Sequence, residues 1–224
     1  MKIIYKIKLY LHILLYRGIK EKVQYSINGE DLFLHNYFKD VPKGRYIDIG
    51  AFHPFRSSNT YKLYKKGWSG FNIDLSKTSI DLFKVARPND INLNLVISDK
   101  KEETIVYQNK DLSKWNTINP TWASMYLKNP YSKKVCSDTL NNVLKKYNSQ
   151  SNKFELINID TEGSEYFILK NIDFDKYKFN LILTGAQYTK KEKDQVLSLL
   201  KSKKYNYLKS MSDTFIFVNA NYQD

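Results

Sequence analysis

Apolar segments with the length of buried strands alternate with helix-like segments along most of this sequence. This alternation predicts a mostly parallel sheet with helices on both faces, because two parallel neighbouring strands need a connection of helix length. We therefore predict a doubly wound α/β fold of Rossmann-like type. The predicted strands are residues 45–50, 70–74, 92–98, 154–160 and 180–183.

The remaining elements follow from caps, turns and periodicity. Residues 104–108 are predicted to be one arm of a hairpin, and residues 205–209 and 214–219 are predicted to pair as two antiparallel strands at the C-terminus. Ser137 is a suitable N-cap, and Thr189 with Glu192 has the pattern of a capping box. The predicted helices are residues 30–38, 58–66, 77–85, 137–147, 164–170 and 189–203.

No repeat or linker divides the chain, so we predict an N-terminal basic amphipathic helix over residues 1–25 and a single domain over residues 26–224. We expect the apolar stripe of this helix to pack on the domain or on a second subunit, and an anionic membrane surface is the alternative. Its uninterrupted apolar run is too short to span a bilayer, which needs roughly 20 residues. On a helical projection the stripe holds Ile3, Ile4, Ile7, Leu11, Leu14 and Leu15, and the basic face holds Lys2, Lys6, Arg17 and Lys20.

Composition indicates the redox compartment of the protein and the charge of its partners. Cys136 is the only cysteine, so neither an internal disulfide nor a zinc thiolate cluster can form, which indicates a reducing, cytoplasmic compartment. The formal net charge of +13 would attract phosphates, anionic lipids, nucleotide-sugars or nucleic acid, and it does not choose among them.

Residues 109–131 have little periodicity and many aromatic side chains, so we predict an irregular insertion there. Flat apolar rings mixed with hydrogen-bonding groups are typical of sugar sites, although the same rings can simply pack the loop onto the domain. The candidate substrate wall comprises Trp115, Asn116, Thr117, Trp122 and Tyr126.

Acidic side chains stand at the ends of three successive predicted strands. Asp48 and Gly50 end the first strand, Asp74 ends the second and Asp99 follows the third. Ligands of doubly wound sheets bind at the carboxyl ends of the central strands, and a carboxylate there can accept both hydroxyl protons of a ribose. Each of these acids can alternatively cap the helix that follows it.

The turn after Gly50 excludes the common dinucleotide site. It continues as Ala51, Phe52, His53 and Pro54, so the G-x-G-x-x-G motif that cradles a pyrophosphate is absent. This argues against NAD or FAD. A Walker A motif is absent as well.

An ordered set of short segments resembles the FkbM-family methyltransferases. The resemblance runs from about residue 26 to about residue 183, and it implies a class I S-adenosylmethionine-binding fold and O-methylation. The segments are Tyr46-Ile-Asp-Ile-Gly-Ala51, His53-Pro54, Ser58-Asn59-Thr60-Tyr61, Leu63-Tyr64, Gly67-Trp68, Gly70, Ile73-Asp74, residues 94–99 and Ile157-Asn-Ile-Asp-Thr-Glu-Gly-Ser-Glu165.

The resemblance also implies roles for individual residues in binding S-adenosylmethionine and its acceptor. By position, Asp48, Gly50 and Ala51 would lie along the methionine part, and Asn59 and Thr60 would hold its carboxylate. Asp74 would bind the ribose, and Ser98 and Asp99 would flank the adenine. The residues that would face the methyl group are Asp160, Glu162 and Gly163.

Methyl transfer to a hydroxyl needs alignment and a base. Glu162, Asp160 and His53 are the candidates for this base. The two carboxylates can instead hold a divalent cation that lowers the pKa of the hydroxyl, and Glu162 can also be a structural acid at a helix N-terminus. The family usually has a glutamate after the strand at residues 181–183, whereas this chain continues with Thr184 and Gly185.

The function expected from these features is O-methylation of a sugar or glycan precursor in surface polysaccharide biosynthesis. The partners would be a sugar, a nucleotide-sugar or a lipid-linked glycan, with peripheral contact to the inner membrane face and a homo-oligomer as further expectations. The alternatives are a catalytically impaired scaffold or subunit, suggested by the absent glutamate, and a nucleic-acid methyltransferase, suggested only by the charge.

Overall fold

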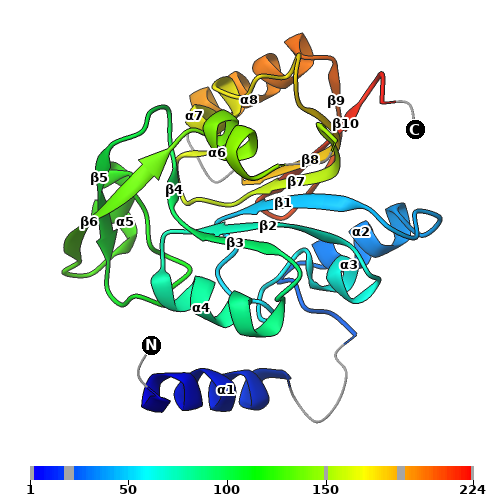
Figure 1. Ribbon diagram of the computed structural model, residues 1–224. Helices are drawn as coiled ribbons and strands as arrows, with labels where there is room; N and C mark the ends of the chain where they lie inside the picture. Colours follow the sequence, from blue (N-terminus) through cyan, green and yellow to red (C-terminus); the bar gives the residue numbers. More distant parts are fainter. Residues whose placement is uncertain (1–2, 18–22, 149–150, 186–189, 223–224) are drawn as a thin grey trace.

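The computed structural model describes residues 3–17, 23–148, 151–185 and 190–222. Its centre is a seven-stranded sheet in which the first five strands are parallel and the last two are antiparallel to their neighbours (Figure 1). The predicted doubly wound sheet and its C-terminal strand pair are therefore confirmed. In sheet order the strands are β3 (Ile91–Asn94), β2 (Ser69–Asp74), β1 (Arg45–Ile49), β7 (Lys153–Ile159), β8 (Lys178–Gly185), β10 (Thr214–Asn219) and β9 (Tyr205–Met211).

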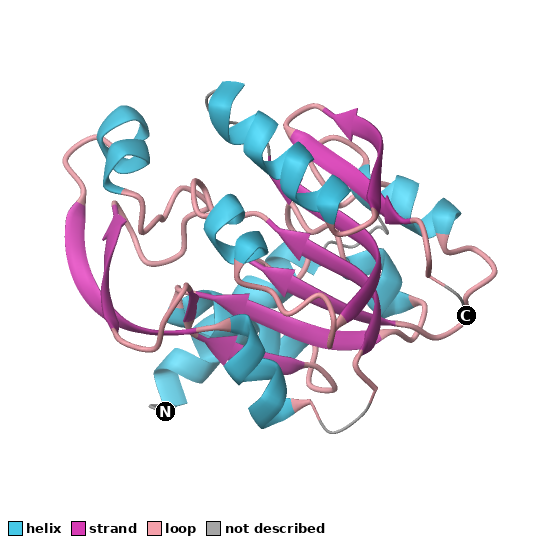
Figure 2. Cartoon of the chain, turned by 90° about the horizontal axis from the view of Figure 1, so that it is seen from above, coloured by secondary structure: helices cyan, strands magenta, loops and turns pink. Residues whose placement is uncertain are grey.

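Helices cover both faces of this sheet (Figures 1 and 2). One face carries α6 (Leu140–Tyr147), α7 (Glu165–Lys170) and α8 (Lys190–Ser202), and the other carries α2 (Glu30–Tyr37), α3 (Tyr61–Lys65) and α4 (Lys77–Ala86). Side chains alternate along β1. Ile47 and Ile49 are therefore buried under α6, α7 and α8, and Tyr46 is buried on the opposite face with residues of α2 and α3. Asp48 therefore points toward the layer of α2 and α3.

A second, three-stranded sheet has the order β4 (Val96–Ile97), β6 (Tyr131–Asp138) and β5 (Glu103–Gln108). The prediction that residues 104–108 form a hairpin arm is confirmed, because β5 pairs with β6 in antiparallel register. The single strand predicted at residues 92–98 is wrong. The chain leaves the main sheet at Leu95, whose N–H donates to Asp74 O (3.1 Å), and Val96 then pairs with Ser137 of the second sheet.

The insertion at residues 109–131 is more regular than predicted. It contains α5 (Pro120–Tyr126), whose N-cap Asn119 accepts hydrogen bonds from the N–H groups of the first turn. Asparagine followed by proline at the first helical position is a recognised helix start, so the sequence did carry this signal.

Three further helix starts need comment. Ser137 is part of β6 rather than an N-cap, and Thr139 caps α6 by accepting a hydrogen bond from the N–H of Asn142 (3.1 Å). The helix predicted from residue 58 begins at Tyr61. Thr189, half of the predicted capping box, lies outside the described residues.

The N-terminal helix α1 (Ile3–Arg17) packs on the domain through a different face from the one predicted. Leu9 and Ile13 are buried against the layer of α3 and α4, whereas the predicted stripe is 52% to 80% exposed. The helix is apolar on nearly all sides, so periodicity alone does not choose the packed face. Lys2, Lys20 and the side chain of Arg17 lie outside the described part of the chain.

A fully buried arginine ties the end of α4 to the segment that follows β1. The Arg87 guanidinium donates to Pro54 O (2.5 Å), Ser58 Oγ (2.8 Å) and Thr60 Oγ1 (2.9 Å). Buried acceptors without a donor are costly, so this one side chain holds the loop in place.

We expect Arg87→Met to lower the free energy of unfolding by about 3–5 kcal/mol, because it leaves several buried acceptors without their donor. Urea unfolding followed by circular dichroism measures the change. Lys84→Met on the same helix is the matched control, since Lys84 is 59% exposed. A loss of less than about 1 kcal/mol for Arg87→Met would contradict the role given to the guanidinium.

Candidate functional site

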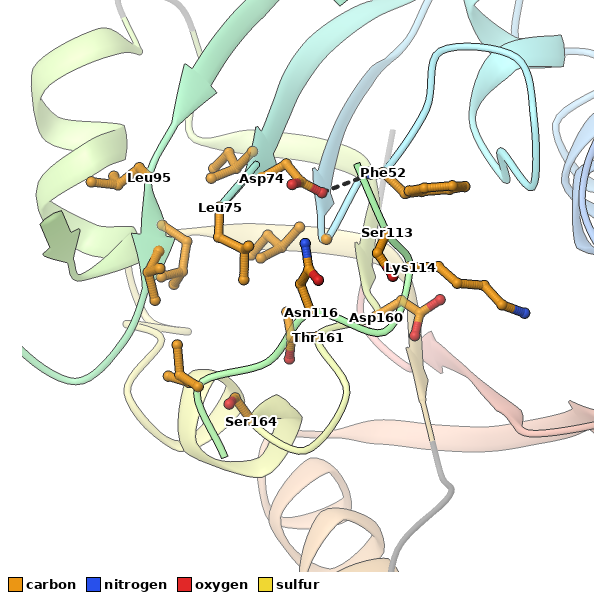
Figure 3. Close-up of a pocket in the computed structure, with 16 residues that line it drawn as sticks. Phe52, Asp74, Leu75, Leu95, Ser113, Lys114, Asn116, Asp160, Thr161 and Ser164 are labelled. Atoms are coloured by element: carbon orange, nitrogen blue, oxygen red, sulfur yellow. Dashed lines mark hydrogen bonds between the residues drawn. The ribbon is translucent and has the colours of Figure 1, made fainter. Parts of the chain in front are cut away.

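A pocket lies at the carboxyl ends of the central strands, and we call it the strand-tip pocket (Figure 3). Residues 113–118 of the insertion and the start of the loop after β7 close its other sides. Seven of its lining residues are aliphatic, as suits a flat ring system, and seven are polar. It is lined by Ile49, Gly50, Phe52, Ile73, Asp74, Leu75, Leu95, Val96, Ile97, Ser113, Lys114, Asn116, Ile118, Asp160, Thr161 and Ser164.

Asp74 is the acid that β2 delivers to this pocket. Its Oδ2 accepts a hydrogen bond from Phe52 N (2.8 Å, dashed in Figure 3), and its Oδ1 accepts one from Ser76 N (2.7 Å). Burial raises the pKa of Asp74 to about 6, although the two backbone donors oppose the shift. Each carboxylate oxygen keeps a further lone pair, so the group is oriented to accept two hydroxyl protons.

A second pocket adjoins the first, and we call it the acidic pocket. The two share Gly50, Phe52, Lys114 and Asp160, so they form one continuous cleft. Most of the side chains around the acidic pocket are polar, and four of them are carboxylates. It is lined by Ile27, Asn28, Glu30, Gly50, Phe52, Ser57, Asn59, Lys114, Trp115, Asp160, Glu162, Gly185, Ser212, Asp213 and Thr214.

The two carboxylates after β7 hold their protons more tightly than ordinary acids. Asp160 opens onto both pockets but has protein around it, and this burial raises its pKa, with repulsion from Glu165 adding to the effect. Burial also raises the pKa of Glu162, and repulsion from Asp160 raises it further. Two neighbouring carboxylates in such surroundings cannot both ionise easily, so the pair retains a proton at pH values where free acids have lost theirs.

The loop that carries Glu162 is held from the insertion. Glu162 has φ +54°, a left-handed conformation that is uncommon outside glycine. Thr117 Oγ1 donates to Glu162 O (2.7 Å), and Asn119 Nδ2 donates to Gly163 O (3.0 Å). Glu165 accepts two further hydrogen bonds from backbone N–H groups of this loop (2.7 and 3.1 Å). These contacts keep the strained residue in place.

Only glycine fits at position 50, because the end of the neighbouring strand β7 lies very close to it. Gly50 has φ +79°, and a Cβ at this position would lie 1.8 Å from Asp160 O. Any larger residue would push the tip of β1 away from the tip of β7. The glycine therefore allows the close approach that builds the cleft.

Several of the residues assigned to S-adenosylmethionine from sequence lie behind the cleft. Asp48 is buried and accepts hydrogen bonds from Thr60 Oγ1 (2.7 Å) and Asn158 Nδ2 (2.8 Å). Thr60 is fully buried, and Ala51 is 4% exposed. None of these three predicted residues lines either pocket, because the alternation along β1 turns Asp48 away from the strand tips.

Other predicted residues line the cleft or its rim. Gly50, Asp74 and Asp160 line the strand-tip pocket, and Asn59 lines the acidic pocket, where its amide donates to Asn158 Oδ1 (3.1 Å). Ser98 and Asp99 line a neighbouring pocket that shares Ile97, Ile118 and Ser164 with the strand-tip pocket.

His53 lies outside both pockets. Its Nδ1 accepts hydrogen bonds from Phe55 N (3.1 Å) and Arg56 N (3.0 Å), and its Nε2 is 3.0 Å from His12 Nε2. Burial lowers the pKa of His12, and the nearby Arg56 guanidinium lowers it further. This geometry favours a structural role for His53 in the turn after β1.

The candidate substrate wall is only partly on the cleft. Trp115 is 40% exposed and lines the acidic pocket, while Trp122 stacks behind it with ring centroids 5.7 Å apart. Asn116 faces the strand-tip pocket, and Thr117 is buried as a support for the loop after β7.

Three charged residues that line the acidic pocket were not among the site residues predicted from the sequence. Glu30 comes from the start of α2, Lys114 from the insertion and Asp213 from the turn between β9 and β10. Local patterns give them no signal, because only the folded chain brings these distant segments together. The resemblance covered Glu30 but implied no role for it.

Among the residues that the structure describes, no group of three or more His, Cys, Asp and Glu side chains is arranged to hold a metal ion. The four carboxylates of the acidic pocket therefore do not form such a group in this arrangement.

A doubly wound sheet with a half-aliphatic pocket and an oriented carboxylate at its strand tips is typical of nucleoside-binding proteins, and class I methyltransferases are among them. Residues 48–207 match the family model described as "Methyltransferase FkbM domain", so the chain belongs to the FkbM methyltransferase family. The resemblance drawn from the sequence is confirmed, and the protein is an S-adenosylmethionine-dependent methyltransferase.

Solved structures with similar folds carry related descriptions. A TehB-like methyltransferase of Corynebacterium glutamicum shares 14% identity, with 96% of this chain and 97% of that chain covered and a TM-score of 0.46. A putative RNA methyltransferase of Pyrococcus horikoshii shares 10% identity, with 100% of each chain covered and a TM-score of 0.46. A putative O-methyltransferase of Klebsiella pneumoniae shares 12% identity, with 96% of this chain and 95% of that chain covered and a TM-score of 0.42. Scores this low carry no argument about function. A comparison with curated proteins finds no significant match.

The residues of the strand-tip pocket fit S-adenosylmethionine. Its aliphatic walls suit adenine, and the Asp74 carboxylate suits the two ribose hydroxyls. When bound, the group supplies a methyl carbon activated by a sulfonium.

We expect Asp74→Ala to raise the Kd for S-adenosylhomocysteine by at least about 10-fold, because hydrogen bonds to a charged acceptor are lost. Wild-type affinity should also fall as the pH drops through about 6, where the half-buried carboxyl of Asp74 takes up its proton. Calorimetric titration between pH 5 and pH 8 measures both effects. Glu103→Ala, on the exposed side of β5, is the control. An affinity that does not change over this pH range would argue against Asp74 as the acceptor.

Proposed function

We propose that the protein is an O-methyltransferase that acts on a hydroxyl group of a sugar or glycan precursor. The observation that carries the proposal is the junction of the two pockets at Asp160. On one side lies the pocket that fits the methyl donor, and on the other lies a polar pocket with a carboxylate pair and an exposed tryptophan face.

In this proposal the pair formed by Asp160 and Glu162 provides the base. The acceptor hydroxyl would give its proton to an ionised carboxylate of the pair as its oxygen forms a bond to the methyl carbon. The bond from that carbon to the sulfonium sulfur would break in the same step and leave neutral S-adenosylhomocysteine. The raised pKa values make these carboxylates stronger bases than ordinary ones, which suits a weakly acidic alcohol. The pair needs only one ionised member to act.

The chemistry of the acidic pocket supports a polyol as acceptor. Trp115 is 40% exposed at the pocket. Trp122 stacks on it with ring centroids 5.7 Å apart, Lys114 Nζ lies 4.5 Å from the Trp115 ring centroid, and Tyr126 in turn lies against Trp122 with centroids 4.6 Å apart. Sugars combine apolar C–H faces with many hydroxyls, so they match a ring beside amides, hydroxyls and carboxylates. The polar residues available for these hydroxyls are Asn28, Ser57, Asn59, Ser212 and Thr214.

The proposal extends to the biological setting. We propose a cytoplasmic enzyme of surface polysaccharide biosynthesis whose acceptor is a sugar, a nucleotide-sugar or a lipid-linked glycan. The single cysteine, Cys136, is exposed and unpaired, which suits a reducing compartment.

The direct test is methyl transfer from labelled S-adenosylmethionine to a panel of free sugars, nucleotide-sugars and lipid-linked saccharides. Turnover on a saccharide hydroxyl supports the proposal. Binding of S-adenosylhomocysteine without turnover on any member would favour the scaffold alternative, and transfer to RNA would favour the nucleic-acid alternative.

We expect Glu162→Gln to lower kcat by roughly 10²–10⁴-fold, the usual contribution of a general base, while the Kd for S-adenosylhomocysteine stays within about 3-fold. Steady-state kinetics and calorimetry measure the two quantities. Glu103→Gln, at a side chain that is 66% exposed, controls for the loss of one carboxylate. Undiminished turnover by Glu162→Gln would rule out this residue as the base.

We expect Trp115→Ala to raise KM for the sugar acceptor by about 10-fold with a smaller change in kcat, because the ring contacts the acceptor in the ground and transition states alike. Trp115→Phe should recover most of the affinity. A KM that does not respond to either change would place the acceptor elsewhere in the acidic pocket.

A further inference from the structure

The outward side of α1 is apolar over most of its length. Every large apolar residue on this side is more than half exposed, so the surface is not part of the core. We call it the outer face of α1. It consists of Ile3 (76% exposed), Ile4 (70%), Ile7 (52%), Tyr10 (56%), Leu11 (54%), Leu14 (67%) and Leu15 (80%).

This face is contiguous. At 100° per residue its seven members occupy an arc of about 140°, with Tyr10 at one edge and Leu15 at the other. Monomeric proteins rarely expose contiguous apolar patches of more than a few hundred Å², and larger ones mark interaction sites.

The orientation of the outer face is set by the opposite side of the helix. Leu9 and Ile13 are buried with Tyr61 and Leu82 of the domain, and Tyr5 Oη donates to Asp81 Oδ2 (3.0 Å). Because this side is anchored, α1 cannot roll its apolar outer face inward. Figure 1 shows α1 lying across the outside of α4.

Cationic side chains border the outer face on both edges. On the helical projection, Lys6 lies beyond Tyr10 at one edge of the arc and Lys8 lies beyond Leu15 at the other. Both lysines are exposed. The sequence of α1 contains no Asp or Glu to neutralise them, and the whole chain has a formal net charge of +13. Lysines in this position can lay their stems along apolar surface and keep their ammonium groups in the polar layer.

We propose that the outer face of α1 docks the protein in the plane of an anionic lipid surface. The apolar side chains enter the boundary between headgroups and acyl chains, and the flanking lysines contact the anionic headgroups. No helix of the described residues is both long and apolar enough to cross a membrane, so α1 lies on the surface. In a second copy of this chain the lysine-lined edges would meet equal charges instead, which is why lipid is the better match.

The test is co-sedimentation of the full chain with vesicles of phosphatidylcholine alone or with 30% phosphatidylglycerol. The wild type should pellet with the anionic vesicles, and added salt should weaken this binding. Leu11→Gln with Leu14→Gln should lower the partition coefficient more than about 10-fold, since two apolar anchors are lost. Lys6→Gln with Lys8→Gln should lower it roughly 10-fold on anionic vesicles and much less on neutral ones.

The matched control is Ile105→Gln with Leu208→Gln, which changes two aliphatic residues exposed by 48% and 44% on other elements. This variant should bind vesicles like the wild type. Calorimetry with S-adenosylhomocysteine should give the same Kd for all variants, which excludes unfolding and keeps the test independent of the acceptor.

Three results would overturn the proposal: no pelleting of the wild type with anionic vesicles, equal pelleting with neutral vesicles, or a dimer in sedimentation velocity that the Leu11 and Leu14 changes convert to a monomer. The last result would make the outer face a contact between copies of this chain.

Discussion

The close approach of the tips of β1 and β7 is the constraint on which the cleft depends. Gly50 lies so close to the carbonyl of Asp160 that a Cβ at this position would clash with it. Residues with positive φ follow both strands: Gly50 and Phe52 after β1, and Glu162 and Gly163 after β7. Behind this contact, Asp48 bridges Thr60 and Asn158 and so fastens the two strands and the start of α3 together. The acids of the cleft project from a frame that these contacts make rigid, which is what a methyl-transfer site needs for alignment.

The insertion and the second sheet complete the site from outside the doubly wound frame. Asp111 is the anchor of this arrangement, since it accepts hydrogen bonds from Thr78 N (2.9 Å) and Lys133 Nζ (2.7 Å). Burial opposes its ionisation, but the lysine and the backbone donor prevail and hold its pKa at about 2. The insertion is thus tied to α4 and β6 while Thr117 supports the loop of Glu162. Through these bonds one segment shapes both the strand-tip pocket and the acidic pocket.

Two surfaces of the molecule have different tasks. The cleft holds carboxylates whose pKa values are raised by the protein around them. The outer face of α1 instead exposes its apolar groups to solvent between two lysines. Anchoring of α1 through Tyr5, Leu9 and Ile13 keeps these two surfaces in a fixed relation. Docking through α1, as proposed, would bring the cleft to the same lipid surface that holds a lipid-linked acceptor.

The order of most strands and helices and the position of the strand tips were readable from the sequence, because hydrophobic period and glycine turns are local properties. The family was identified separately, by the resemblance of an ordered set of motif segments. The same local signals placed Gly50, Asp74 and Asp160 correctly at strand ends. They could not show that Asp48 turns away from the cleft or that β4 leaves the main sheet, since both follow from pairing with distant strands. Nor could they choose which side of α1 is buried, because a helix that is apolar nearly all round takes its orientation from the tyrosines and aliphatic residues it meets. Glu30, Lys114 and Asp213 joined the site for the same reason: only tertiary contacts bring separate segments of the chain to one pocket.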